Sequence, residues 1–182
     1  MKKMDDVLRD LLSNQKGNII EIGAGIGETT RLLLHIAREF DVKVIVIDPH
    51  ELGWDEMPDS YGKPYPFETF KKNTSDYSEQ MILYRESSQS EGLCEKLQKH
   101  KPYIFSFVDG LQYKQAVLND LNMMRELGCI CICVDDYTRI TSISEVPLAI
   151  EEFMKNEEYE LIHETVNSRA KAFLIKKNYE NK

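Results

Sequence analysis

The chain has 182 residues, of which 42% are hydrophobic and 30% are charged, so it is long enough to bury the core of one compact domain. Its 23 basic and 31 acidic side chains leave a formal net charge of -8, which disfavours phosphate backbones and anionic membrane surfaces as partners. We therefore expect a single domain over residues 1–182 that binds neither nucleic acid nor a membrane.

The sequence shows no targeting or membrane-spanning signal. Lys2 and Lys3 are followed by acidic residues instead of the apolar run of a secretory signal, and the longest apolar stretch, 129–134, is far shorter than a membrane span. Three cysteines alternate with isoleucine in that stretch, which predicts a strand with sulfur on one face rather than a zinc site. Reduced thiols are typical of a cytoplasmic protein.

Apolar runs and helical periods alternate along the chain. In chain order they predict a helix within residues 1–16, a strand at 19–22, a helix around 32–37, a strand at 44–47, a loop at 49–65, a helix at 66–77, a strand at 81–84, a short helix at 93–97, a strand at 103–108, a helix at 116–127, a strand at 129–134, a helix at 146–154 and a hairpin of 159–163 with 170–175. This order predicts an α/β, Rossmann-like doubly wound fold with a mostly parallel sheet and a C-terminal antiparallel hairpin strand. Ligands of such sheets bind beyond the carboxyl ends of the strands.

The first predicted strand ends in a glycine-rich turn, E-I-G-A-G-I-G-E at residues 21–28. Glycines allow a tight turn and a close approach of a ligand to the backbone. A dinucleotide fingerprint requires its third glycine where Glu28 stands, and a carboxylate there would face the pyrophosphate. The turn therefore favours a ligand without phosphates, and the alternative is a tight turn with no ligand.

The second predicted strand ends at Asp48, roughly 20 residues after Gly27, which is the spacing at which an acid reaches ribose hydroxyls. A carboxylate can accept two hydrogen bonds from a vicinal diol. An aspartate that only forms a turn is the alternative.

Together, E-I-G-A-G-I-G, V-I-V-I-D-P and F-V-D-G resemble the class I S-adenosylmethionine-dependent methyltransferases over nearly the whole chain. The resemblance implies that Glu21 and Gly23 lie by the methionine portion of the cofactor. It also implies that Gly25 and Gly27 line the turn and that Asp48 holds the ribose.

The ends of the third and fourth predicted strands extend this resemblance. Ser88 and Gln89 resemble a Ser-Gln pair that touches adenine in catechol-type O-methyltransferases. Asp109, which follows the fourth strand, is a candidate for contact with both the cofactor and the acceptor.

Three acids stand at the ends of two predicted neighbouring strands: Asp109 after the fourth, and Asp135 and Asp136 after the fifth. Three close carboxylates would raise one another's pKa, and a bound Mg²⁺ would relieve the repulsion. O-methyltransferases of the catechol and macrolide-sugar types carry a similar acidic set, so the resemblance implies a Mg²⁺ that holds the acceptor hydroxyls. The alternatives are that these acids contact the cofactor, cap a helix or face solvent.

The general base of the resembling enzymes is a His or Lys at the position of Gln112, and glutamine takes no proton near neutral pH. Either the base lies elsewhere, the metal alone acidifies the acceptor hydroxyl, or the reaction differs. His50 is a candidate base at the rim of the site, and Tyr113, Tyr137 and Arg139 are others. Asp109, Gln112 and His50 are therefore the candidate catalytic residues.

The resemblance implies methyl transfer from S-adenosylmethionine to a hydroxyl of a small molecule or sugar. The aromatic-rich loop at 49–65 is expected over the site, and the helix within 1–16 is expected as core, lid or part of a homodimer interface. Two other functions stay open. A non-catalytic module that binds the nucleoside cofactor is kept open by Gln112, and an NAD-dependent oxidoreductase is disfavoured by Glu28.

Overall fold

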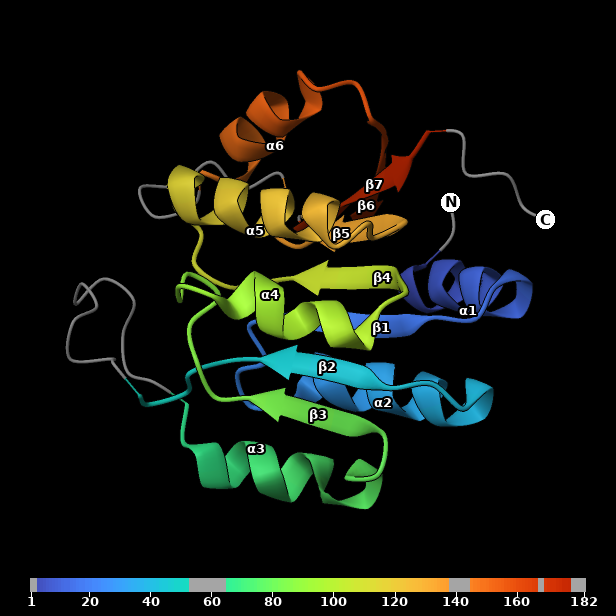
Figure 1. Cartoon of the computed structure of the whole chain (residues 1–182), viewed down its shortest axis with the longest axis vertical. Coiled ribbons are helices and arrows are strands. Elements are labelled where there is room, and N and C mark those ends of the chain that lie inside the picture. Colours follow the sequence, from blue (N-terminus) through green and yellow to red (C-terminus); the bar gives the residue numbers. More distant parts are fainter. Residues whose placement is uncertain (1–2, 53–64, 138–144, 167–168, 178–182) are drawn as a thin grey trace.

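The computed structural model of the chain describes residues 3–52, 65–137, 145–166 and 169–177. Its strands form one seven-stranded sheet in the order β3-β2-β1-β4-β5-β7-β6 (Figure 1). The strands are β1 (Asn18–Ile22), β2 (Val44–Ile47), β3 (Met81–Tyr84), β4 (Tyr103–Val108), β5 (Cys131–Val134), β6 (Tyr159–Val166) and β7 (Arg169–Lys176). Strands β1 to β5 pair in parallel, whereas β7 runs antiparallel to both β5 and β6. The predicted Rossmann-like sheet with an antiparallel C-terminal hairpin is confirmed.

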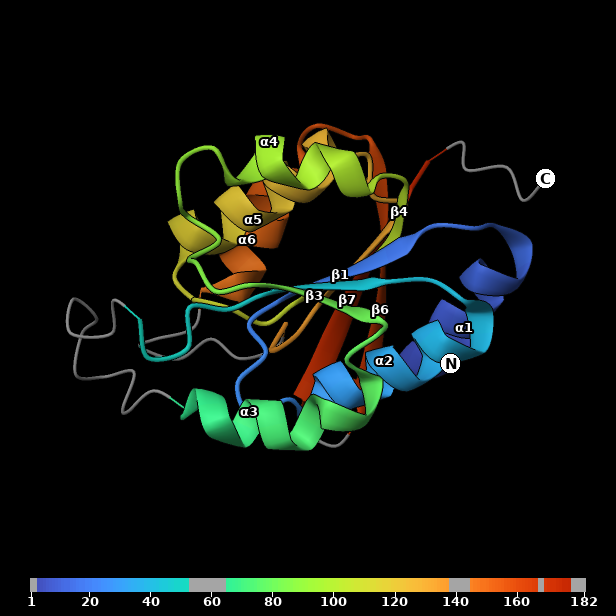
Figure 2. The same ribbon diagram turned by 60° about the horizontal axis from the view of Figure 1, so that its bottom comes forward.

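Helices cover both faces of the sheet. They are α1 (Met4–Asn14), α2 (Glu28–Phe40), α3 (Phe67–Thr74), α4 (Leu93–Leu97), α5 (Lys114–Glu126) and α6 (Val146–Met154), with short 3₁₀ turns η3 (Ser75–Tyr77) and η4 (Gln98–His100). Figure 2 shows α1, α2 and α3 on one face and α4, α5 and α6 on the other. The buried side chains accordingly form two apolar clusters, one on each face.

Helix α1 is part of the core. Its side chains Met4, Leu8 and Leu12 are buried in the cluster on the α2 face of the sheet. The apolar stripe at helical spacing therefore packs against the domain itself, which is one of the three roles that the sequence left open.

One detail of the cysteine pattern differs from the prediction. Strand β5 begins at Cys131, and Cys129 lies between α5 and β5, where its amide donates to the Met124 carbonyl in the last turn of α5. Cys129 consequently lies in the α5 cluster, whereas Cys131 and Cys133 lie in the opposite one. The prediction that the three thiols share one face is wrong for Cys129, since strand alternation applies only inside the strand.

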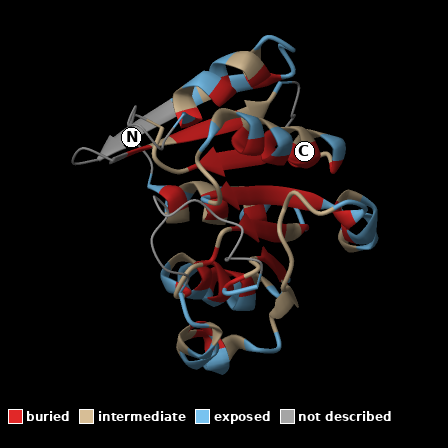
Figure 3. Ribbon diagram, turned by 90° about the vertical axis from the view of Figure 1, so that its left-hand side faces the viewer, coloured by how far each residue is buried: buried red, intermediate tan, exposed pale blue. Residues whose placement is uncertain are grey.

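The parallel strands end at one edge of the sheet, which Figure 3 views end on, with the buried strands in red. Strand β1 pairs with β2 and β4, and β4 pairs with β5. The turns after these four strands therefore meet at this carboxyl edge. No helix in the described part of the chain is long and apolar enough to cross a membrane.

Candidate functional site

The glycine turn after β1 needs glycine for both its conformation and its packing. Gly23, Gly25 and Gly27 have positive φ angles of 82°, 52° and 86°, which side chains rarely adopt. A Cβ on Gly23 would stand 2.2 Å from the backbone oxygen of Asp109, and one on Gly25 would stand 3.3 Å from the ring of Tyr65. The turn is therefore pressed against the end of β4, with Tyr65 close to it.

Asp48 holds this turn in place. Its Oδ2 accepts hydrogen bonds from the amides of Ala24, at 2.6 Å, and Gly25, at 2.9 Å, and its Oδ1 accepts one from the amide of His50, at 2.6 Å. A carboxylate has about four acceptor positions, so a further donor can still bind at Oδ1. Asp48 thus has a structural role that the sequence did not predict, and its contact with a ribose stays a prediction.

Glu21 is a buried acid beside this turn. It is 0% exposed, and neither carboxylate oxygen has a hydrogen-bond partner among the described residues. Burial raises the pKa of Glu21 to about 8, and the nearby charges of Asp109 and Asp48 raise it further. The Thr30 hydroxyl lies close enough to oppose this rise, although it forms no hydrogen bond of normal geometry. A cation placed next to this buried acid would stabilise the charged form of its carboxyl group.

His50 does not stand at an open rim, and that expectation is wrong. It is only 2% exposed, its φ is 52°, and its ring packs against the rings of Phe70 and Phe67 at centroid distances of 4.7 and 5.1 Å. Its Nδ1 lies 3.6 Å from Oδ1 of Asp48. Burial lowers the pKa of His50, and its enclosure by α3 gives no support to a role as the base.

Glu51 joins the two ends of the predicted loop at 49–65. Its Oε2 accepts the Phe67 amide at 3.2 Å, and its Oε1 lies 3.3 Å from a guanidinium nitrogen of Arg85. The Arg85 guanidinium also stacks 3.9 Å from the centre of the Phe67 ring. The stretch between these anchors, residues 53–64, lies outside the described residues, so the expected cover over the site is not described.

The turn after β3 is tied to helix α5. The Gln89 amide nitrogen donates to Oδ1 of Asp120 at 2.8 Å and to the Ser88 hydroxyl at 3.0 Å, and the Gln89 oxygen accepts from Asn119 at 2.8 Å. These bonds occupy the polar groups that the resemblance assigns to adenine. The turn that contains Ser88 and Gln89 is therefore held against α5 by side-chain hydrogen bonds.

Sequence reasoning missed Asp120. It is 1% exposed, its Oδ2 has no hydrogen-bond partner in the described part of the chain, and burial raises its pKa to about 7 against the opposing bonds from Ser88 and Gln89. A signal did exist, since Asp120 falls among the apolar residues that recur at helical spacing along α5.

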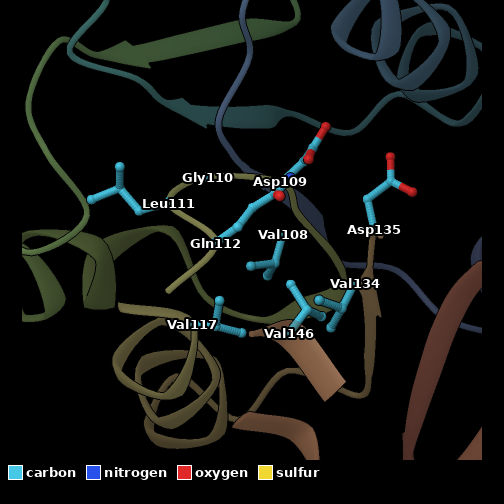
Figure 4. A pocket seen from close by; sticks show the side chains of 9 residues that line it. All are labelled: Val108, Asp109, Gly110, Leu111, Gln112, Val117, Val134, Asp135 and Val146. Carbon is cyan, nitrogen blue, oxygen red and sulfur yellow. The ribbon is translucent and has the colours of Figure 1, made fainter. Parts of the chain in front are cut away.

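The first acid after β4, Asp109, and the first after β5, Asp135, point to the same side of the sheet. Figure 4 shows the side chains of Asp109 and Asp135 on one side of the sheet, opposite the valines that line the hollow. Asp136 differs: its backbone turns into the left-handed region, with φ of 53°, and its carboxylate accepts the Gln112 amide at 2.8 Å. Within the described ranges, no three His, Cys, Asp or Glu side chains are arranged to hold a metal ion.

A lysine contacts the predicted metal site. The Lys171 ammonium, from β7, lies 2.8 Å from Oδ1 of Asp135 and 4.6 Å from the centre of the Phe107 ring. The sequence offered no signal for this contact, because Lys171 reaches β5 only through the antiparallel hairpin.

The hollow beside these acids is small. Its cavity volume is about 10 Å³, far below the 300–1,000 Å³ that is typical of ligand pockets. Its lining consists of Val108, Asp109, Gly110, Leu111, Gln112, Val117, Val134, Asp135 and Val146 (Figure 4).

Comparison with known proteins identifies the fold. No protein-family model and no curated protein matches the chain, but many solved structures do. The TDP-rhamnose 3′-O-methyltransferase CalS11 of calicheamicin biosynthesis superposes with a TM-score of 0.66 at 15% identity, over 94% of this chain and 77% of that one. An O-methyltransferase from Bacillus cereus, in complex with S-adenosylhomocysteine, gives 0.63 at 16% identity over 94% and 80%.

A third structure agrees with these two. The O-methyltransferase TomG of tomaymycin synthesis from Streptomyces achromogenes, bound to S-adenosylmethionine, gives a TM-score of 0.62 at 13% identity over 94% of this chain and 79% of that one. The chain therefore has the fold of the class I S-adenosylmethionine-dependent methyltransferases, as its motifs predicted.

Proposed function

We propose that the chain is an S-adenosylmethionine-dependent methyltransferase that transfers a methyl group to a hydroxyl of a small molecule or sugar. The observation that carries this proposal is the buried, unpartnered carboxylate of Glu21, directly before a turn of three glycines with positive φ. Asp48 and Asp109 place negative charge at this edge of the sheet, and a cation bound beside the buried Glu21 favours the charged form of its carboxyl group. Such an edge suits a ligand that carries positive charge and repels a diphosphate.

In this proposal, each residue of the site contacts a different part of the cofactor. When bound, the cofactor supplies a methyl group on a positively charged sulfur. Glu21 would face the positive charges of its methionine portion, the remaining acceptor position on Asp48 Oδ1 would take a ribose hydroxyl, and the glycines would let the backbone come close. Alignment of the acceptor oxygen with the methyl group then supplies up to roughly 7–11 kcal/mol of the barrier reduction.

The acceptor would lie on the side of Asp109 and Gln112. Gln112 cannot remove a proton, but its amide is held by Asp136 at 2.8 Å and can orient an acceptor. The carboxylate of Asp109 would accept the proton of the acceptor hydroxyl, and the glycine turn packs directly on its backbone. A general base in contact with the acceptor contributes typically about 10²–10⁴ in rate.

The donor set does not fit the Mg²⁺ that the resemblance implies. The Asp135 carboxylate is bonded to Lys171, and the Asp136 carboxylate accepts from Gln112. Mg²⁺ requires near-octahedral oxygen ligands that converge, and these two acids are committed to other partners. The proposed reaction therefore includes no step at a metal ion.

Calorimetry with S-adenosylhomocysteine and with NAD tests the proposal. We expect binding of the first and none of the second, because a diphosphate would meet the negative charges of Asp48 and Asp109. Replacing Glu21→Gln should weaken S-adenosylhomocysteine binding by about tenfold or more, equivalent to about 1.4 kcal/mol, whereas the exposed control Asp76→Asn should leave it unchanged. Binding of NAD alone, or equal affinity in both variants, would contradict the assignment.

The second candidate function is a non-catalytic module that binds the same cofactor. The Gln112–Asp136 hydrogen bond favours this function, because it holds an amide at the position where the resembling enzymes have a His or Lys base. Incubation with S-adenosylmethionine and a panel of hydroxylated acceptors separates the two functions. Release of S-adenosylhomocysteine only when an acceptor is present supports the enzyme. Tight cofactor binding without any such release supports the module.

A further inference from the structure

The C-terminal hairpin brings a basic side chain to the acidic edge of the sheet. In the antiparallel pairing of β5 with β7, Val134 stands opposite Ala172, so Lys171 comes level with the segment just beyond the end of β5. The Lys171 ammonium reaches Oδ1 of Asp135 at 2.8 Å, with relative side-chain exposures of 29% for Lys171 and 16% for Asp135. The pair is thus partly shielded from water, where the attraction between opposite charges is stronger than at an open surface.

The same ammonium lies over an aromatic face. It stands 4.6 Å from the centre of the Phe107 ring, a distance at which the ring quadrupole attracts a cation. Phe107 is 1% exposed and belongs to the apolar cluster on the α2 side of the sheet. Two independent contacts, one ionic and one aromatic, therefore hold the lysine at this position.

Asp109 lies on the same side of the sheet as this lysine. Phe107 and Asp109 are two residues apart along one chain direction, and alternate residues of a strand share a face. Figure 4 shows Asp109 and Asp135 pointing to the same side. The charge of Lys171 therefore acts on an edge that carries two carboxylates.

We propose that the ammonium of Lys171 is the resident cation of the acidic edge formed by Asp109 and Asp135, and that it occupies the place of a divalent metal ion. An ammonium has three N–H donors, so a cation bonded to Asp135 keeps donors for an oxygen of the acceptor. That last consequence rests on the proposed methyltransferase function, whereas the replacement of a metal by Lys171 does not.

Titration with Mn²⁺, followed by the loss of its free electron paramagnetic resonance signal, tests the proposal without any enzyme assay. The wild-type chain should bind no Mn²⁺ at this edge up to about 1 mM, the weak end of the range of protein sites for divalent ions. Lys171→Met should gain Mn²⁺ affinity by about tenfold or more, because it frees Asp135 beside Asp109. Adding Asp135→Asn to Lys171→Met should abolish the gain.

Lys177→Met is the matched control, because it removes the same charge from an exposed position just past the end of the same strand. It should bind no more Mn²⁺ than the wild type. If Lys171→Met fails to fold by circular dichroism, Lys171→Gln removes the charge while keeping a polar end and serves in its place.

Two results would overturn the proposal. One is a Mn²⁺ site in the wild-type chain that Asp135→Asn removes, since the acids would then hold a metal despite the lysine. The other is the absence of any gain in the folded Lys171 variants, since the lysine would then take no metal's place. Calorimetry with S-adenosylhomocysteine reports separately on the cofactor site, so either proposal can fail alone.

Discussion

At the scale of single residues, the site is marked by acids that the fold buries rather than by a recognisable catalytic group. Glu21 and Asp120 are the two buried carboxyl groups with raised pKa values, and each has an oxygen without a hydrogen-bond partner among the described residues. Both lie near the carboxyl edge, one before the glycine turn and one behind the turn after β3. Natural proteins tolerate such groups mainly where they serve a ligand or a reaction.

The raised pKa of Glu21 makes stability depend on pH. The folded chain holds a proton on Glu21 up to about pH 8, whereas the unfolded chain loses it near the ordinary glutamate pKa of 4.5. The folded state therefore binds more protons between these values, and the free energy of unfolding falls as pH rises through this window, by at most about 1.4 kcal/mol per pH unit.

Glu21→Gln removes this dependence. Urea unfolding at about pH 6 and at about pH 8.5 should show a smaller loss of stability in the variant than in the wild type, because the amide cannot ionise. Asp76→Asn, at an exposed position, should keep the wild-type slope. Identical slopes in Glu21→Gln and wild type would show that Glu21 ionises as freely in the folded chain as in the unfolded one.

At the scale of elements, the turn after β3 and helix α5 act as one unit. Gln89 donates to Asp120 and accepts from Asn119, both at 2.8 Å. Because the hydrogen bonds of Ser88 and Gln89 oppose the raised pKa of Asp120, the turn after β3 stabilises the charged form of a buried acid.

Replacing Gln89→Ala should therefore lower the free energy of unfolding by about 1–3 kcal/mol, the cost of a buried acceptor left without its donor. The loss should be larger above about pH 7 than at pH 5, since the variant raises the pKa of Asp120 further and the charged form suffers most. Urea unfolding at both pH values measures it. Gln98→Ala, at an exposed position on η4, is the control, and an equal loss in both variants would contradict the coupling.

At the scale of the whole molecule, the two apolar clusters support different parts of the site. The cluster under α4, α5 and α6 supports the turns after β3, β4 and β5, and the cluster under α1, α2 and α3 supports the glycine turn and Asp48. Helix α1 lies toward the end of the sheet opposite the carboxyl edge (Figure 1). It should therefore contribute to the free energy of unfolding without contacting the site.

Truncating Leu8→Ala in α1 tests this division. Leu8 is 0% exposed, so its truncation should cost about 2–5 kcal/mol of unfolding free energy. Leu32→Ala, at a position 37% exposed on α2, should cost about 0.5 kcal/mol or less. Neither variant should change S-adenosylhomocysteine affinity at a temperature where both are folded. A Leu8→Ala variant with wild-type stability would place α1 outside the core.

Local patterns in the sequence were sufficient to predict the order of helices and strands, the antiparallel hairpin and the positions where the strands end. They also predicted a tight glycine turn after the first strand and the location of Asp48 and Asp109 at one edge. These features depend on hydrophobic periodicity and on glycine chemistry, which neighbouring residues specify by themselves.

Only the tertiary structure decided which groups meet at that edge. It gave Asp48 to the amides of the glycine turn, enclosed His50 against α3 and brought Lys171 to Asp135. The physical reason is that a hydrogen bond or ion pair requires atoms within a few ångströms, and that proximity follows from strand order and register across distant segments. A sequence pattern predicts which acids reach the edge of a sheet, but not which partners they find there.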